Sequence, residues 1–243
     1  MRNTTIATIS LKGSRLSFAL IAIVLLVLTG CGRVLNAPSF NNMTAIEKNS
    51  EIVGDEKNEI VGNVNKAIFD SVDRANLKAE TYETGVIEKS GMEVKVPEGR
   101  YMIFAGMAGN VFVYDEQGDL VIRELFDEIY GVDSLTVDIR DDYTVFFDGG
   151  NEGATIMPAE TLISNELTPG IWEVGVDIEA GKYSISVGGG VLGHLQVFDP
   201  NKEVRVYELI GGDTTRTESH VELVDGQKLK ITGINSIQFN PTE

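Results

Sequence analysis

The sequence predicts a mainly β protein with two tandem small antiparallel β-sandwich or partly open barrel units, preceded by one helix. Three observations lead to this prediction: apolar and polar residues alternate over short segments, turn-forming residues separate these segments, and an internal repeat covers most of the chain. The alternation places one face of each strand in a core and the other in water.

The repeat consists of short matching segments that occur twice in the same order. The segment 111–115 (VFVYD) matches 195–199 (LQVFD), and 96–101 (VPEGRY) matches 178–183 (IEAGKY). Three further matches have nearly the same separation along the chain: 123–125 with 207–209, 139–143 with 223–227, and 156–158 with 238–241. Matches in one order and at a steady separation indicate a duplication, with copies at 85–160 and 168–243.

The second copy shows the strand pattern most clearly. Its alternating segments are 182–187, 194–198, 203–208, 220–223 and 228–231. Asp199-Pro200-Asn201 and Asp225-Gly226 are turn sequences, the second of them typical of a β-hairpin. Short strands at regular spacing predict a small sandwich or a partly open barrel. Because the link between the copies (159–168) is short, we expect the two units to be in contact.

Residues 31–55 are predicted to be a tether, and residues 56–82 an amphipathic helix. Apolar residues recur at helical spacing in the second stretch, and Asp55 is placed to cap the helix. Gly62 lies inside the pattern and costs about 1 kcal/mol relative to alanine. The helix either packs on the first β unit or serves as a stalk or partner helix. A coiled coil is disfavoured because the a-like row formed by 61, 68 and 75 has no matching d row.

Residues 1–30 have the order of a secretory signal peptide. Arg2, Lys12 and Arg15 precede an apolar run from Phe18 to Leu28, and small residues follow it. This run is much shorter than the roughly twenty residues of a membrane-spanning helix.

Residues 28–31 (LTGC) resemble the lipobox of bacterial lipoproteins. In that family the cysteine sulfur receives a diacylglycerol, and the chain is cut just before the cysteine. The resemblance implies a mature protein that begins at Cys31, carries acyl chains such as palmitate, and is anchored to the outer face of the cell membrane. An ordinary secreted protein is the alternative. Cys31 is the only cysteine of the chain, so an internal disulfide is excluded.

A second resemblance concerns residues 174–183 (VGVDIEAGKY). They look like the V-G-x-D-I-x-A-G-x-Y opening of a small β domain that recurs in secreted proteins and lipoproteins of Gram-positive bacteria. The first copy has EVKVPE at 93–98 and lacks the aspartate and the alanine of this pattern. The resemblance implies a fold and an extracellular location, and it supplies no catalytic residues.

The formal net charge of −17 limits the possible partners. The leader carries three basic residues and no acidic residue, so its removal changes the net charge from −17 to −20. Such a surface repels phosphate backbones and anionic lipid heads, and we therefore expect no nucleic-acid partner. The acidity supports solubility, with attraction of cations at the cell surface as the alternative.

Several motifs suggest ligand sites that their context disfavours. Residues 188–193 match G-x-G-x-x-G, but a strand follows where a dinucleotide fold requires a helix. Asp115 and Asp119 flank Gly118 and are candidate calcium ligands. A solvated hairpin turn is the preferred interpretation, because the segment joins two strands and lacks the glutamate expected at the twelfth position of a calcium loop. A second group of acids is unspecific: Asp138, Asp141, Asp142 and Asp148.

The remaining candidates for chemistry are two histidines, one tryptophan and the many acids. His194 and His220 are too few for a zinc site and are interpreted as ordinary strand residues. Trp172 is either an exposed platform for sugar stacking or part of a core. Acidic pairs suited to glycoside cleavage are not distinguishable among so many carboxylates.

From the sequence we expect a lipid-anchored cell-surface protein that acts as a non-catalytic binding or structural module at the bacterial envelope. Its partners would be the membrane through Cys31, and a cell-wall polymer or another envelope protein. No cofactor and no catalytic residue are expected. The alternatives are an envelope-glycan hydrolase that uses acidic residues and a calcium-responsive surface module.

Overall fold

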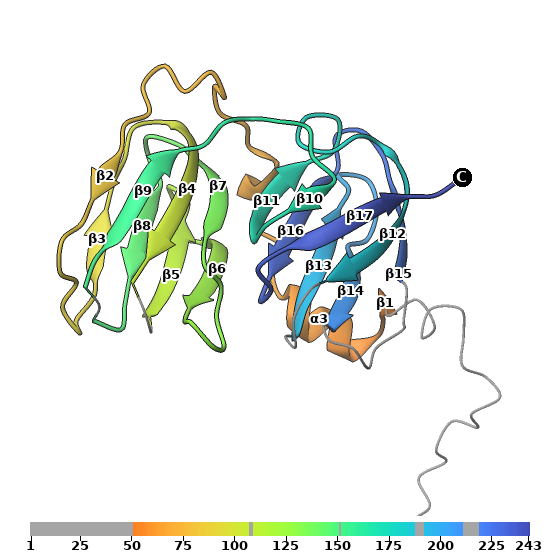
Figure 1. Ribbon diagram of the computed structural model, residues 1–243, viewed down its shortest axis with the longest axis horizontal. Helices are drawn as coiled ribbons and strands as arrows, with labels where there is room; N and C mark the ends of the chain where they lie inside the picture. Colours follow the sequence, from red (N-terminus) through yellow and green to blue (C-terminus); the bar gives the residue numbers. More distant parts are fainter. Residues whose placement is uncertain (1–50, 107–108, 151, 188–191, 211–218) are drawn as a thin grey trace, which may run out of the picture. The chain divides into compact units, whose positions relative to one another are not determined.

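The computed structural model describes residues 51–243 except 107–108, 151, 188–191 and 211–218, and it shows a mainly β protein (Figure 1). The described residues all belong to one unit of the chain, residues 44–243. The leader, Cys31, most of the predicted tether and most of the glycine-rich segment 188–193 lie outside the described residues.

The first half of this unit contains two four-stranded sheets. One sheet has the order β7-β4-β9-β2 and the other the order β3-β8-β5-β6. The strands are β2 (Tyr82–Glu83), β3 (Met92–Val94), β4 (Gly99–Ala105), β5 (Gly109–Tyr114), β6 (Leu120–Phe126), β7 (Leu135–Ile139), β8 (Thr144–Phe147) and β9 (Ala154–Pro158). We call this half the first sandwich.

The second half repeats this arrangement. Its sheets have the orders β15-β12-β17-β10 and β11-β16-β13-β14, so each strand occupies the place of the strand eight positions earlier. The strands are β10 (Glu166–Leu167), β11 (Gly170–Glu173), β12 (Gly181–Val187), β13 (Leu192–Phe198), β14 (Arg205–Ile210), β15 (Ser219–Leu223), β16 (Lys228–Thr232) and β17 (Ile237–Pro241). We call this half the second sandwich.

Equivalent side chains make equivalent contacts in the two sandwiches. The Tyr101 hydroxyl donates to the carbonyl of Pro97 at 2.7 Å, and the Tyr183 hydroxyl donates to the carbonyl of Glu179 at 2.8 Å. Both contacts tie a strand to the turn just before it. The two tyrosines and the two carbonyls occupy matching positions of the sequence repeat.

Strand pairing corrects the repeat alignment at one place. Val111 of β5 pairs with Glu124 of β6, whereas Leu195 of β13 pairs with Tyr207 of β14. Because Val111 and Leu195 are equivalent in the repeat, Glu124 corresponds to Tyr207. The match of 123–125 with 207–209 in the sequence places Glu124 opposite Glu208, the next residue, instead. That match would have reversed the direction of every side chain in β14.

The two sandwiches share one sheet of nine strands. Its order is β1-β14-β13-β16-β11-β7-β4-β9-β2, where β1 (Glu51–Ile52) extends the far edge. The two halves meet where β11 runs parallel to β7, with Gly170 beside Thr136, and the Thr136 N–H donates to the Pro169 carbonyl at 2.9 Å. Gly170 has φ +150°, and a Cβ there would collide with the Thr136 carbonyl. Glycine therefore permits this close approach.

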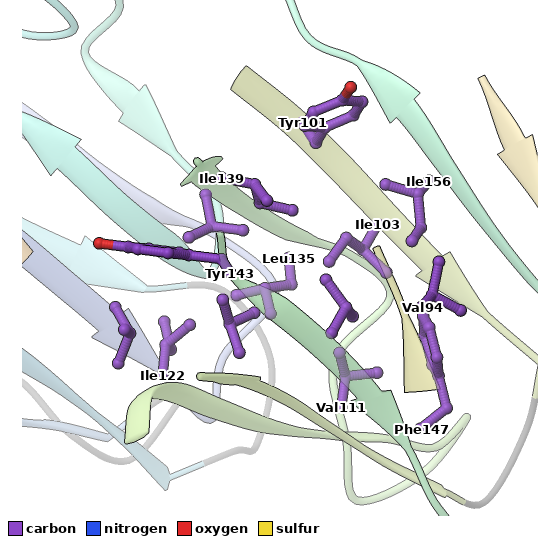
Figure 2. Packing of buried hydrophobic residues seen from close by; sticks show 14 of the residues in the cluster. Val94, Tyr101, Ile103, Val111, Ile122, Leu135, Ile139, Tyr143, Phe147 and Ile156 are labelled. Carbon is purple, nitrogen blue, oxygen red and sulfur yellow. The ribbon is translucent and has the colours of Figure 1, made fainter. Parts of the chain in front are cut away.

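The outer sheets of the two sandwiches cover opposite faces of the shared sheet. Leu135, Val137 and Ile139 of β7 point into the first core, which Figure 2 shows in part. The alternate residue, Thr136, points the other way beside Gly170, and Trp172, further along β11, packs against the second core. Because successive residues of a strand face opposite sides, the two cores lie on opposite faces of one sheet.

The predicted amphipathic helix over 56–82 is wrong beyond its first two turns. The helix α3 (Asp55–Val61) stops at Gly62, which has φ +58°, and only a short 3-10 turn, η2 (Lys66–Phe69), follows. Gly54 occupies the capping position predicted for Asp55. From 71 to 77 half-buried and exposed residues alternate, which is the period of an extended chain. The apolar residues of this segment therefore recur at helical spacing although the chain forms no continuous helix there.

The segment 51–83 ties the two sandwiches together from outside. Its strand β1 pairs with β14 of the second sandwich, and β2 pairs with β9 of the first. Between them, Ile68 of η2 is buried in the first core, together with Ile171 and Phe198 of the second sandwich. The predicted tether boundary at 55 is therefore too late, because β1 is already part of the sheet.

Candidate functional site

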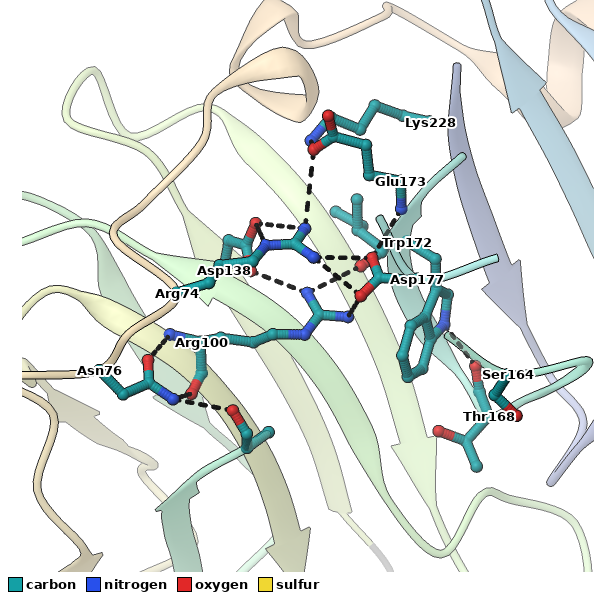
Figure 3. A network of polar contacts seen from close by, with 12 residues as sticks. Arg74, Asn76, Arg100, Asp138, Ser164, Thr168, Trp172, Glu173, Asp177 and Lys228 are labelled. Atoms are coloured by element: carbon teal, nitrogen blue, oxygen red, sulfur yellow. Dashed lines mark hydrogen bonds and ion pairs between the residues drawn. The ribbon is translucent and has the colours of Figure 1, made fainter. Parts of the chain in front are cut away.

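A cluster of charged side chains lies where the N-terminal segment and the two sandwiches meet (Figure 3). Arg74 comes from the segment 51–83, Arg100 and Asp138 come from β4 and β7 of the first sandwich, and Asp177 comes from the turn after β11. We call these four residues the ionic cluster. Glu173 and Lys228, paired at 2.7 Å, lie beside it.

Asp177, like Asp138, is contacted by both arginines. Its two oxygens each accept from Arg74 Nη1 at 2.8 Å, and Oδ2 also accepts from the Glu173 N–H at 2.8 Å. Arg100 Nη2 approaches Oδ1 at 3.3 Å. Asp177 is the aspartate of the motif at 174–183, so the motif residue closes its own turn and binds arginines from two other parts of the chain.

Arg100 is completely buried between the sandwiches. Its Nη1 donates to Asp138 Oδ1 at 2.8 Å, and its guanidinium lies 4.7 Å from the centre of the Trp172 ring. Its Nε has no hydrogen-bond partner. Its Nη2 forms an ion pair with Asp177 but no hydrogen bond. The flat, weakly hydrated guanidinium tolerates this stacked position in a way that a lysine would not.

Trp172 is therefore part of the contact between the two sandwiches, which we call the joint. It is half-buried, stacks on Arg100, and its indole N–H donates to the Thr168 carbonyl at 2.8 Å. Of the two interpretations that the sequence left open, the structure supports the packed one over the exposed sugar platform.

The ionic cluster has a structural role. Burial lowers the pKa of Arg74, but the charges and hydrogen bonds of Asp138 and Asp177 outweigh burial and raise that pKa overall. The carboxylates of the cluster already accept from guanidinium or backbone N–H groups. A buried charge cluster of this kind fixes which elements meet, since any misplacement leaves a charge unpaired.

Of the two calcium candidates, the Asp115 carboxylate has a role in the fold, whereas Asp119 is exposed and takes part through its backbone. Asp115 is nearly buried, its Oδ1 accepts from the N–H groups of Gln117 and Asp119, and its Oδ2 accepts from the Asn65 side chain at 2.8 Å. Asp115 thus closes the β5–β6 hairpin and binds it to the N-terminal segment. Within the described part of the chain, no group of three or more His, Cys, Asp or Glu residues is arranged to hold a metal ion.

The second acidic group is dispersed rather than gathered. Asp138 belongs to the ionic cluster, Asp141 accepts from the Glu98 N–H, and Asp142 pairs with Arg140. Asp148 accepts from both the backbone and the side chain of Asn110. Each of these carboxylates therefore already has a partner within the fold.

The two histidines lie on different sheets. His194 of β13 is half-buried opposite Glu208, and burial lowers its pKa although Glu208 and Glu56 act in the other direction. His220 of β15 is exposed and lies opposite Ser184 of β12.

An open hollow lies beside Arg205 of the second sandwich. Arg205 donates to the Glu222 carbonyl at 2.8 Å and to the Tyr207 hydroxyl at 3.2 Å. Lys182 and Glu222, which also line the hollow, are direct neighbours on β12 and β15. Because its wall carries charges of both signs, with the arginine already engaged, the hollow has no clear preference for a charged ligand.

Glu124 is a buried acid that the sequence did not single out. It is 5% exposed and accepts from the Gly233 N–H of the second sandwich at 3.2 Å. Burial raises its pKa to about 7, although the hydrogen bond from Gly233 and the charges of Lys230 and Arg123 act in the opposite direction. Nearby, Lys230 Nζ donates to the Val121 carbonyl at 3.2 Å, and burial lowers the pKa of Lys230.

Comparison with known proteins gives no family: no family model matches the chain, and neither the curated proteins nor the solved structures provide a significant match. The resemblances of 28–31 and 174–183 therefore rest on those residues alone.

The ionic cluster predicts a large effect of Asp177→Asn. Removing one charge leaves Arg74 and Arg100 buried without full compensation, so we expect the free energy of unfolding to fall by about 3–5 kcal/mol. Urea unfolding measures this change. The control is Glu203→Gln, because Glu203 pairs with Lys57 at the surface and its side chain is 91% exposed; a change within about 0.5 kcal/mol is expected. Equal effects of the two substitutions would contradict the assigned role.

Glu124 predicts a stability that depends on pH. The folded protein retains the Glu124 proton up to about pH 7, whereas the unfolded chain releases it near 4.5. Unfolding therefore releases a proton between these values, and the contribution of Glu124 to stability falls as the pH rises through this window and is constant above it. Glu124→Gln removes this slope in urea unfolding over that window, whereas the exposed Glu128→Gln retains it. A slope that is the same in Glu124→Gln as in the wild type would refute the assignment.

Proposed function

We propose that the protein is a lipid-anchored module on the outer face of the bacterial cell membrane, and that it binds or organises envelope components without catalysing a reaction. The observation that carries this proposal is the LTGC sequence at 28–31, placed directly after a basic and apolar leader. Within the described part of the chain, no helix has the length and apolar character needed to cross a membrane.

The use of the buried charges supports a binding or structural role. Asp177, Asp138 and Arg100 join the sandwiches through hydrogen bonds and ion pairs, and Asp115 closes a hairpin. Glu124 has a pKa suited to a general acid, but it is buried against Gly233 at the junction of the two sandwiches. A catalytic acid must reach its substrate, so this carboxyl favours neither hydrolysis nor proton transfer.

The anchored location and the charge narrow the choice of partner. The chain without its leader has a net charge of −20, since removal of the three basic residues lowers the value of −17, and this charge disfavours strongly anionic polymers. A neutral wall polymer or another envelope protein with a basic surface fits this charge.

The anchor predicts a clear result for Cys31→Ser. The wild-type protein should sediment with membranes and incorporate a labelled fatty acid, because two acyl chains are enough for stable membrane binding. Cys31→Ser should take up no label and be lost from the membrane fraction after a high-salt wash. Ser39→Ala, which changes a nearby serine after the cysteine, serves as the control and should behave as the wild type does. Equal partitioning and labelling of wild type and Cys31→Ser would contradict the anchor.

A further inference from the structure

The outward face of the sheet β3-β8-β5-β6 carries aromatic side chains. In β5 and β8 the inward residues, among them Val111, Val113 and Phe147, are buried in the first core. The outward residues Phe112, Tyr114 and Phe146 are only half-buried. Strand alternation explains the inward residues but not the choice of three aromatic residues for the outward face.

These rings form a continuous surface. The rings of Phe112 and Tyr114 are parallel within 5° and their centres are 6.0 Å apart. Phe146 lies directly opposite Phe112 in the strand pairing, with ring centres 5.9 Å apart. We call Phe112, Tyr114 and Phe146 the aromatic strip.

Polar groups of fixed orientation border the aromatic strip. Arg123 lies opposite Phe112 on β6, with its guanidinium 5.4 Å from the Phe112 ring. Asn110 Oδ1 accepts from Arg123 Nε at 3.0 Å and from Nη2 at 2.6 Å, and Asn110 Nδ2 donates to Asp148 Oδ1 at 3.0 Å. Glu93 lies opposite Phe146 on β3 and is exposed. The rim thus offers donors and acceptors of both charges around an apolar centre.

In the second sandwich, the equivalent face of the sheet is covered by other parts of the same chain. The residues that correspond to Phe112 and Tyr114 are Gln196 and Phe198, and both are buried. Phe198 packs into the first core beside Ile68 of the N-terminal segment. In the second sandwich, other parts of the chain therefore cover this face of the sheet. In the first sandwich, the aromatic strip on the equivalent face is partly exposed to water.

We propose that the aromatic strip binds a neutral glycan chain, a ligand class that depends on the proposed function at the envelope. The C–H faces of pyranose rings pack on aromatic rings, and the hydroxyls at the ring edge both donate and accept hydrogen bonds, as the groups of the rim do. Flat aromatic surfaces with a polar rim are typical of binding sites rather than of inert surface. The net charge of the chain disfavours a polyanionic ligand.

The test uses the chain from Gly32 to Glu243, with an N-acetylglucosamine tetramer and purified peptidoglycan sacculi as probes. The double variant Phe112→Thr/Tyr114→Thr keeps β-forming residues at outward positions, so the fold should be retained in circular dichroism and thermal unfolding. We expect it to bind the tetramer about tenfold more weakly, or worse, by calorimetry, and to be lost from the sacculi pellet. The matched control is Phe104→Thr/Met157→Thr, at exposed positions of β4 and β9, which should bind as the wild type does.

A second variant keeps the test valid if the double variant unfolds. Phe112→Tyr retains a ring at the same place and should bind within about twofold of the wild type, whereas Phe112→Thr alone should not. Three outcomes would each overturn the glycan site. The wild type and Phe112→Thr could bind equally well, or the wild type could bind neither probe. The third outcome is that the substitutions abolish self-association of the protein and have no other effect. None of these outcomes refutes the envelope module, which fails instead if the wild-type protein cleaves the tetramer or is not anchored.

Discussion

The structure depends on the contact of Asp177 with two arginines from different parts of the chain. Arg74 brings the N-terminal segment to this aspartate and Arg100 brings the first sandwich, while Asp177 itself closes the turn after β11 of the second. Beside it, the parallel pairing of β11 with β7 turns two four-stranded sheets into parts of one nine-stranded sheet. Because the charges are buried, this arrangement is favourable only when all three parts are in place, which makes the joint specific.

The duplication explains the architecture, and the differences between the copies explain how it is used. Asp177 corresponds to the exposed Lys95 of the first copy, and the buried Arg100 corresponds to the exposed Lys182 of the second. At each of these two positions one copy thus contributes a buried charged residue to the ionic cluster, and the other copy leaves the equivalent residue in water. The two copies also differ in the face that carries Phe112 and Tyr114 in the first sandwich. That face is partly exposed and aromatic in the first sandwich, and the equivalent face is buried in the second.

Local patterns predicted the mainly β fold and the presence of a repeat, because strand alternation and turn residues act over a few positions. They failed where distant contacts decide the outcome. The apolar spacing of 60–75 suggested a long helix, but Gly62 ends α3 and Ile68 is drawn into the first core instead. Arg74 and Arg100 carry no signal in the sequence, because their shared partners Asp138 and Asp177 lie far along the chain, one in each copy. Asp177 was visible only as part of a motif, and Glu124, whose pKa burial raises, accepts a hydrogen bond from Gly233, far along the chain in the second sandwich.

Native-state hydrogen exchange in increasing urea tests the central claim, that the shared sheet and the ionic cluster make the two sandwiches one cooperative unit. Amides of β5 in the first sandwich and of β12 in the second are far apart in sequence and lie in the outer sheets. If the joint couples the sandwiches, the exchange of both sets converges on a single opening with the same free energy and the same dependence on urea. If one outer sheet exchanges through a separate opening of distinctly lower free energy while the other stays protected, the sandwiches are independent and the account is wrong.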